Sequence, residues 1–385
     1  MKIAVLAHIR YPIAEPFRGG MEAHCRGLCN GLRAAGHEVT LFAAQGSQDE
    51  QLVPICPAPY DDVLPWDVWR GTPELFEYQR AAFAKAREAI AIGGYDVVHN
   101  NSLFTDAIAW FAADGVPCVT SQHVPPFGTM RDAVRAAAPH PQARFTVTSA
   151  SQLHLWDADC RTRMAAAPNG IDTDAWQPCA ERGDHFTWVG RVVPNKGLAE
   201  AVAAARIAGV KLQIYGPIED AAYFADRVEP LLSEGIEYRG HARTEDLCSA
   251  IGPARAALVT PMWDEPFGLV AAEALACGVP VVAFDRGAMR EVIGDCGIVV
   301  PPGDVAALAE AMRQVGGIDR TACRARAVRH LSIEAMIRRY EEAYAAAVAG
   351  SREAAMLATS DTVMAASTPA LARSSSQPST VALLA

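Results

Sequence analysis

The sequence predicts an α/β protein built from two Rossmann-like, doubly wound domains that face each other across a cleft. Short, almost continuously apolar segments alternate with helical segments along most of the chain, which is typical of parallel sheets covered on both faces. The alternation pauses in a turn-rich segment, 167–178, and a second series of similar size then begins. The chain has 385 residues, 51% of them hydrophobic, which is enough to build two cores.

The first half of the chain contains the elements of one such domain. Its strand segments, beginning with KIAVLAH, are apolar along almost their whole length, as expected of strands buried on both sides. We expect strands at 2–8, 38–44, 95–101, 117–123 and 144–151, and helices near 20–35, 72–92, 104–113 and within 124–139.

The second half matches the first in pattern but not in residues. We expect strands at 185–191, 210–216, 236–240, 255–261, 280–285 and 297–302, and helices after Lys196, from Gly268 to Cys277 and from about 321 to 349. The last segment has few large residues and reads as mostly disordered. The expected domains are therefore 1–178, 179–349 with the terminal helix, and a disordered tail at 350–385.

Composition excludes some classes of protein. The net charge of −10 argues against a general nucleic-acid binder, because such proteins carry a basic footprint. The ten cysteines are scattered without a Cys-x-x-Cys pair, as in a reducing cytosol, so we expect a cytoplasmic protein. No window reaches the roughly 18 apolar residues of a membrane span, so membrane contact is expected to be peripheral at most. The oligomeric state stays open.

A first motif, RGGMEAH, lies between the first strand and the first helix. Gly19 and Gly20 allow a ligand to approach the backbone closely, and the helix N-terminus that follows offers unpaired N–H groups to an anion. The segment does not match Gly-x-Gly-x-x-Gly, so a dinucleotide fingerprint is not supported.

A second motif, VGRVVPNKG, places two cations between a strand end and a helix start. Arg191 offers a planar fork and Lys196 a point charge, which together suit a diphosphate. The chain has only four lysines, and this scarcity argues against an incidental surface lysine at this place.

A third motif, WDEPFGLVAAEALACG, carries two carboxylates in an apolar segment. Glu265 lies in a loop, and Glu273 lies in the second turn of a helix that begins at about Gly268. A glutamate on such an apolar helix needs a polar partner, and two vicinal hydroxyls, as in ribose, are one such partner. A capping carboxylate plus a buried ion pair is the alternative.

These segments resemble four motifs of glycosyltransferase family 4. EPFGLVAAE is similar to its E-x-F-G-x-x-x-x-E segment, GRVVPNKG to its phosphate segment, GGMEAH to its N-terminal G-G-x-E loop and PNGIDTDAW to its interdomain segment. They occur in the family's order, and the resemblance covers about residues 1–349. It implies the GT-B architecture of two Rossmann-like domains and a retaining, nucleotide-sugar-dependent enzyme.

The resemblance implies a role for each matching residue. Arg191 and Lys196 would bind the donor diphosphate, and Glu273 the ribose hydroxyls. The remaining positions would lie around the transferred sugar: Glu265 on its hydroxyls, the backbone of Phe267, Gly268 and Leu269 beside it, Gly20 across the cleft, and His123 near the anomeric centre. For His123, a hydrogen-bonded histidine at a strand end is the alternative.

The implied reaction moves a hexosyl group from a nucleotide-diphosphate sugar to an acceptor hydroxyl with retention. UDP-sugars are favoured by family frequency and GDP-sugars come next, and no metal or other cofactor is expected. An epimerase or a glycoside phosphorylase of the same fold is the alternative, and a non-enzymatic nucleotide-sugar-binding protein is a further one. Stretches 9–18 and 124–139 are the candidates for acceptor binding, and a lipid, protein, polysaccharide or small metabolite acceptor stays open.

Two segments carry weaker metal signals. Asp157–Asp159 spells the D-x-D string of metal-dependent transferases of another architecture, and His24, Cys25 and Cys29 share a helix. No further ligand cluster accompanies either segment, so we expect no metal site.

Overall fold

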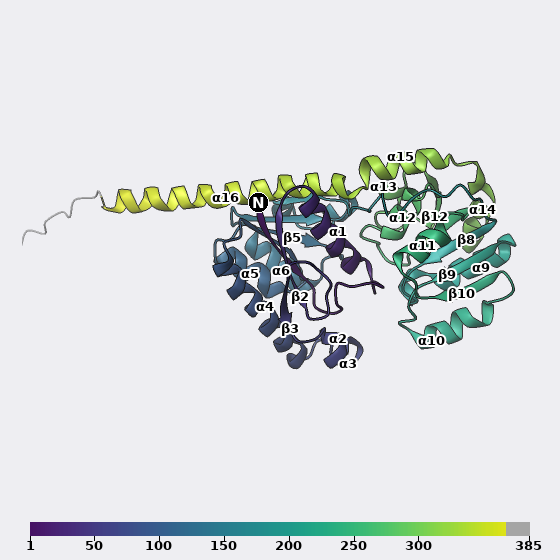
Figure 1. The fold of residues 1–385 in the computed structure, drawn as a ribbon, viewed down its shortest axis with the longest axis horizontal. Coiled ribbons are helices and arrows are strands. Elements are labelled where there is room, and N and C mark those ends of the chain that lie inside the picture. The colour runs from purple at the N-terminus through teal and green to yellow at the C-terminus, as the bar shows by residue number, and fades with distance from the viewer. Residues whose placement is uncertain (367–385) are drawn as a thin grey trace, which may run out of the picture.

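A seven-stranded parallel sheet forms the core of the first domain in the computed structural model, which describes residues 1–366 except for the side chains of 355 and 357–366 (Figure 1). The strands lie in the order β3-β2-β1-β4-β5-β6-β7. Their bounds are β1 Lys2–Ala7, β2 Glu38–Ala44, β3 Leu52–Cys56, β4 Val97–Asn101, β5 Cys118–Gln122, β6 Ala143–Val147 and β7 Met164–Ala166.

Helices cover both faces of this sheet. On β1, Ile3 and Val5 pack on one side, whereas Ala4 and Leu6 pack on the other, because successive side chains of a strand alternate between faces. The helices are α1 Gly20–Ala34, α2 Tyr60–Val63, α3 Trp66–Trp69, α4 Pro73–Gly93, α5 Thr105–Ala113, α6 Gly128–Ala137, α7 Ala150–Leu153 and α8 Ala158–Arg161. Helix α1 packs on the face that carries Ile3 and Val5, and α4 packs on the face that carries Ala4 and Leu6.

The second domain contains a six-stranded parallel sheet in the order β10-β9-β8-β11-β12-β13. Its strands are β8 His185–Val189, β9 Lys211–Tyr215, β10 Ile236–Gly240, β11 Ala256–Val259, β12 Val281–Phe284 and β13 Gly297–Val300. Its helices are α9 Leu198–Ala208, α10 Ala221–Tyr223, α11 Thr244–Ile251, α12 Leu269–Ala276, α13 Met289–Ile293, α14 Val305–Gln314 and α15 Arg320–His330. The expected fold class, two doubly wound α/β domains, is confirmed.

Both sheets reverse their strand order at the same kind of place. In the first sheet β1 lies between β2 and β4, and in the second β8 lies between β9 and β11. Connections leave in opposite directions from such a switch point, which opens a crevice beyond the carboxyl ends of the strands where ligands bind. The residues that follow β1, β4, β8 and β11 are therefore placed to form a site.

The end of the chain differs from the expected single helix at 321–349. Helix α15 stops at His330, and a separate helix, α16 Ile333–Ala366, begins after Ser332. Ser332 caps the second helix, since its side chain accepts from Ala335 N at 3.3 Å. Ile171 also bonds both sides of the break, because its N–H donates to Leu331 O and its carbonyl accepts from the Ile333 N–H.

Helix α16 crosses back to the first domain and runs along its sheet (Figure 1). Tyr340 and Tyr344 are fully buried there, and the Tyr344 hydroxyl lies 2.5 Å from His99 Nδ1. The helix runs 17 residues past the expected end at 349, to Ala366, so 350–366 is helical where a disordered tail was expected. The rest of that expected tail, 367–385, lies outside the described residues.

Several short elements were not expected from the sequence. These are β3, β7, α2, α3, α7 and α8 in the first domain and α10, α11, α13 and α14 in the second. Within residues 1–366, no helix combines the length and apolar character needed to cross a membrane.

Candidate active site

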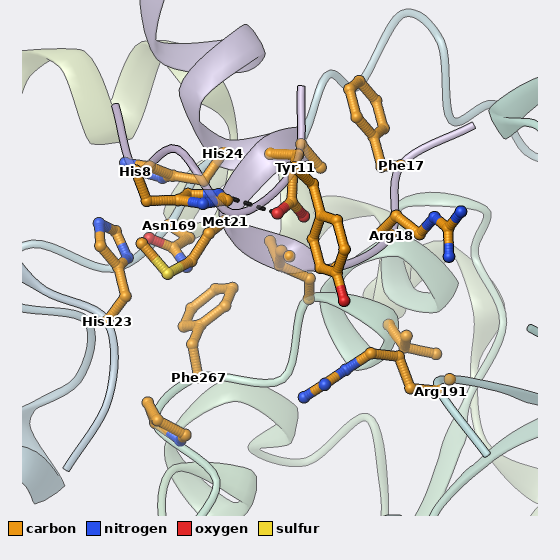
Figure 2. Close-up of a pocket in the computed structure, with 18 of the residues that line it drawn as sticks. His8, Tyr11, Phe17, Arg18, Met21, His24, His123, Asn169, Arg191 and Phe267 are labelled. Carbon is orange, nitrogen blue, oxygen red and sulfur yellow. Dashed lines mark ion pairs between the residues drawn. The ribbon is translucent and has the colours of Figure 1, made fainter. Parts of the chain in front are cut away.

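A cleft of about 1320 Å³ lies between the two domains, beyond the carboxyl ends of both sheets. Pockets for one drug-sized ligand have about 300–1,000 Å³, so this cleft has room for two substrates. Its lining comes from both domains. Figure 2 shows His8, His24, His123 and Asn169 gathered at one end, with Tyr11, Arg18 and Arg191 at the other.

Arg191 lies two positions after the last residue of β8 and lines the second-domain side of the cleft. The turn that carries it is tight, since a Cβ on Gly216 would lie 1.8 Å from Gly190 O, where Gly216 has a φ of +140°. The Arg191 Nη1 atom lies 2.6 Å from Glu219 Oε2. The other oxygen of Glu219 lies 3.3 Å from Nη2 of Arg10, which belongs to the first domain. Glu219 therefore joins the two domains through two arginines.

Lys196 ends a short 3₁₀ helix, Pro194–Lys196, and precedes α9. The next residue, Gly197, has a φ of +68°, and a Cβ there would lie 2.0 Å from Thr260 O. The Thr260 hydroxyl donates to Lys196 O at 3.0 Å, so the end of β11 fixes the lysine backbone. Only a glycine allows this close approach.

Glu265 lies opposite Lys196 in the loop after β11. Its Oε2 atom is 2.6 Å from Lys196 Nζ and accepts from Trp263 Nε1 at 2.9 Å. The lysine ammonium also lies 5.3 Å from the centre of the Trp263 ring. The expected loop carboxylate is thus paired with the expected phosphate lysine.

The N-terminus of helix α12 lies between the two predicted carboxylates. Gly268 caps the helix with a φ of +87°, and the first N–H groups of a helix have no partner within it. Phe267, Gly268 and Leu269 all line the cleft. Across the cleft, a Cβ on Gly20 would lie 2.6 Å from Leu269 Cδ1, so the glycine-rich loop touches this helix start.

Glu273 lies in the second turn of α12, as expected, and its side chain faces the cleft. Among the described residues, no hydrogen bond or ion pair joins its carboxyl group to another side chain. Burial raises the pKa of Glu273 to about 7. A carboxyl group held this way is ready to pair with hydroxyl donors.

His123 follows β5 and lines the first-domain side of the cleft. Its Nε2 atom lies 2.9 Å from Asn101 Oδ1, so His123 is hydrogen-bonded at the strand end and also lines the cleft. The two interpretations of its position therefore do not exclude each other. Burial is the main cause that holds the pKa of His123 well below its ordinary value, and the neighbouring His24 and His8 lower it further. The ring is therefore neutral at pH 7.

The cleft residues that were not predicted as site residues include four polar ones. His8 follows β1, Glu22 and His24 lie in the first turns of α1, and Asn169 lies in the interdomain segment PNGID. Polar residues at strand and helix ends were a usable signal for His8 and Glu22. Nothing in the sequence distinguished the His24 and Asn169 side chains from structural polar residues.

Every residue predicted to bind the donor or to act near the transferred sugar lines this one cleft. The two candidate acceptor stretches contribute to it as well, through Ile9, Arg10, Tyr11, Glu15, Phe17 and Arg18 and through Val124, Phe127 and Thr129. The individual roles stay predictions.

The segments with metal signals lie elsewhere or are divided. Asp157 pairs with Arg135 at 2.5 Å outside the cleft lining, and Cys25 and Cys29 are buried in the first core while His24 faces the cleft. Within residues 1–366, no group of three or more His, Cys, Asp or Glu side chains is arranged to hold a metal ion.

Two family models match the chain, one in each domain. Residues 18–175 match the model of Glycosyltransferase Family 4, and residues 183–316 match that of Glycosyl transferases group 1. Together they cover both walls of the cleft.

The chain also resembles known proteins over most of its length. It is 28% identical over 368 residues to a D-inositol 3-phosphate glycosyltransferase of Mycolicibacterium smegmatis, covering 82% of this chain and 83% of that one. It is 26% identical over 326 residues to a phosphatidyl-myo-inositol mannosyltransferase of the same organism, covering 78% and 82%. Among solved structures, a sucrose-phosphate synthase of Thermosynechococcus elongatus superposes with a TM-score of 0.74 at 21% identity, covering 89% of this chain and 98% of that one.

Proposed function

The chain belongs to glycosyltransferase family 4, and we propose that it moves a hexosyl group from a nucleotide-diphosphate sugar to an acceptor hydroxyl with retention of configuration. That it is a glycosyltransferase follows from its family. The donor, the stereochemistry and the metal independence are our proposal. A UDP-sugar is the first donor to test and a GDP-sugar the second.

The observation that carries the proposal is the pair of cations on the second-domain wall. Arg191 and Lys196 both line the cleft, and both are held by fixed backbone turns. Negative charge develops on the leaving diphosphate as the sugar–phosphate bond breaks, and preorganised cations stabilise it without a metal. The N-terminus of α12 adds further N–H donors at the same wall.

The proposed bond changes need no nucleophile from the protein. The bond between the anomeric carbon and the phosphate oxygen breaks, and its electron pair leaves with the nucleoside diphosphate. The acceptor oxygen bonds to the same face of the anomeric carbon, and its proton goes to the departing phosphate oxygen. No oxidant, reductant or cofactor enters this balance.

His123 fits a hydrogen-bonding role in this reaction better than that of an acid. Its ring is neutral because burial and the neighbouring histidines lower its pKa. With Nε2 engaged at Asn101 Oδ1, the proton of the ring is on Nε2 and Nδ1 is an acceptor. We therefore propose that His123 accepts from a hydroxyl of the transferred sugar.

The relatives' names direct the choice of acceptor probe. Two of them act, by name, on D-inositol 3-phosphate and on phosphatidyl-myo-inositol. We propose a polyhydroxylated acceptor of this general kind, and myo-inositol and D-inositol 3-phosphate are the probes to use first.

The test is a melting-temperature screen followed by a product assay. A bound donor stabilises the folded chain in proportion to its affinity, so UDP-glucose, GDP-mannose and ADP-glucose are compared first. The effective donor is then incubated with the acceptor probes, and nucleoside diphosphate and product anomer are measured. If a sugar phosphate forms instead, and only when inorganic phosphate is added, the protein is a phosphorylase. Binding of a nucleotide sugar without any turnover would indicate a non-enzymatic protein.

A further inference from the structure

The first-domain wall of the cleft contains buried polar atoms that have no partner within the described residues. Besides Nε2 of His8, Nε of Arg26 and Oδ1 of Asn169, they include Oε2 of Glu22 and both ring nitrogens of His24. Glu22 and His24 are only 3% and 2% exposed, yet both line the cleft. Native proteins satisfy nearly all their buried polar groups, so unpartnered ones that face a cavity indicate a ligand or ordered water.

Glu22 has one carboxyl oxygen at ion-pair distance from His8 and the other without a partner among the described residues. The Arg10 N–H donates to His8 Nδ1 at 3.2 Å, which places the imidazole proton on Nε2. That nitrogen faces Glu22 Oε1 at 2.8 Å. Burial alone would raise the pKa of Glu22, but His8 and the nearby backbone N–H groups outweigh it and lower the pKa. The residue is thus a carboxylate whose Oε2 makes no hydrogen bond within the described residues, although the backbone N–H groups of Gly19 and Glu22 lie near the carboxyl group.

His24 lies beside His123 without any bond of its own. The two ring centres are 4.4 Å apart, so His24 is adjacent to the residue that we place at the transferred sugar (Figure 2). Burial, with a smaller contribution from His99, lowers the pKa of His24 to about 3, which leaves the ring neutral. A neutral imidazole has one donor and one acceptor nitrogen, and both are unused here.

The chemistry of these atoms selects a class of ligand. A free carboxylate oxygen requires a donor, whereas the neutral imidazole requires both an acceptor and a donor. A hydroxyl group supplies both functions, but a phosphate or carboxylate supplies only acceptors and would be repelled by Glu22. Neighbouring hydroxyls of a polyol match the set.

We propose that Glu22 and His24 form the subsite that binds the hydroxyls of the acceptor, with His8 as the positioning residue for Glu22. The inference rests on the proposed function, because it requires a second, hydroxylated substrate beside the donor. The subsite lies on the first-domain wall, whereas Arg191, Lys196 and Glu265 lie on the second-domain wall. An acceptor held there lies next to His123.

A structural role for Glu22 is the competing explanation. Glu22 is the third residue of α1, from which a glutamate can reach back to the N–H of the capping residue, here Gly19. A Cβ on Gly19 would lie 3.2 Å from Glu22 Oε2, so the two are close. A purely capping Glu22 would affect folding stability and both substrates alike, which separates it from an acceptor subsite.

The test compares Glu22→Gln and His24→Leu with a matched control, Gln122→Met. Gln122 is also fully buried with an unpartnered amide, but it does not line the cleft. Transfer to myo-inositol and to D-inositol 3-phosphate is measured at varied acceptor and varied donor concentration. We expect the acceptor KM to rise about 10- to 100-fold in the two cleft variants, as for the loss of hydrogen bonds to a charged or buried group. The donor KM should change by less than about 3-fold.

Folding stability provides the second readout, which does not depend on turnover. Removing an unpartnered polar group relieves the folded state, so the melting temperature of His24→Leu should rise or stay within about 2 °C of the parent. Gln122→Met should behave the same way in melting and leave both KM values near those of the parent.

Three results would overturn the subsite. They are a parallel rise of donor and acceptor KM in the cleft variants, unchanged acceptor KM in both, and transfer by the parent to neither inositol probe although it consumes donor. A parent that neither binds nor consumes any nucleotide sugar would instead overturn the proposed function, and the two failures are therefore distinguishable.

Discussion

The two walls of the cleft differ in how their polar side chains are paired. On the second-domain wall the charges are paired, Arg191 with Glu219 and Lys196 with Glu265, at 2.6 Å in both cases. On the first-domain wall the buried atoms of His24 and the outer oxygen of Glu22 have no partner among the described residues. Arg191 and Lys196 are thus paired before a ligand arrives, whereas Glu273 on the same wall and the atoms of Glu22 and His24 on the other wall are not.

The difference shows two ways to build a binding site. A paired cation is not left as an uncompensated buried charge, but a ligand phosphate must compete with its carboxylate partner, so affinity is a difference between two ion pairs. An unpartnered buried group lowers stability, yet a ligand that satisfies it gains the full interaction. Each of the following predictions tests one side of this contrast.

The largest expected effect is at the donor wall. Lys196→Ala removes a preorganised cation at the reacting phosphate, so kcat/KM should fall by about 10²-fold or more. The matched control is Lys211→Ala, since Lys211 pairs with Asp184 on the surface, and this variant should keep the parental rate. Near-normal transfer by Lys196→Ala and by Arg191→Ala would contradict the diphosphate assignment.

The affinity for UDP or GDP should depend on pH through Glu273 in the parent, but not in Glu273→Gln. Glu273→Gln removes an acceptor of the ribose hydroxyls, so titration calorimetry should give about 10-fold weaker binding of UDP or GDP. Because burial raises the pKa of Glu273 to about 7, the ratio of parental to variant affinity should increase as pH rises from 6 to 8, where the carboxyl ionises. An affinity that does not differ between the two proteins would remove Glu273 from the ribose site.

The same raised pKa predicts an effect on the ligand-free protein. The ionised carboxyl is disfavoured in the folded state, so the parent binds a proton more tightly folded than unfolded. Its free energy of unfolding should therefore fall relative to that of Glu273→Gln as pH increases from 4.5 to about 7. A pH-independent difference would show that the carboxyl titrates normally.

A smaller effect is expected where the two walls touch. In Gly20→Ala the new methyl group meets the Leu269 side chain, so the walls are displaced by part of an ångström and transfer should slow by about 5- to 10-fold. Leu269→Ala combined with Gly20→Ala should recover part of the rate because it restores the space. Additive losses in the double variant would mean that the contact is not the cause.

The smallest expected effect is a gain at the paired wall. Glu219→Gln frees Arg191 from its carboxylate, and such partly exposed pairs contribute about 0–1 kcal/mol, so donor affinity should improve by up to about 5-fold. Calorimetry with UDP checks this. Weaker binding would show that Glu219 orients Arg191 for the phosphate and does not compete with it.

The sequence predicted more of the residues that line the second-domain wall than of those that line the first-domain wall. Arg191, Lys196, Glu265 and Glu273 lie in short motifs whose order along the chain is informative by itself. The ion-pair partners of these residues were not predictable. Glu219, the partner of Arg191, lies 28 positions beyond it and outside the motif.

The acceptor wall depends on contacts between distant segments. His8, Glu22 and His123 come together only because β1, α1 and β5 meet at one edge of the sheet. The return of α16 was missed for the same reason, because Tyr344 and His99 are 245 positions apart and nothing in a local pattern links them. Periodicity gave the elements, but side-chain contacts across the fold decided which polar residues face the cleft.

The division of the cleft into a donor wall and an acceptor wall is tested most directly by the melting-temperature shift that UDP or GDP produces in the parent and in four variants. The account predicts a clear shift in the parent, a shift of similar size in Glu22→Gln and His24→Leu, and a strongly reduced shift in Arg191→Ala and Lys196→Ala. A shift that disappears in the first pair and persists in the second would contradict it.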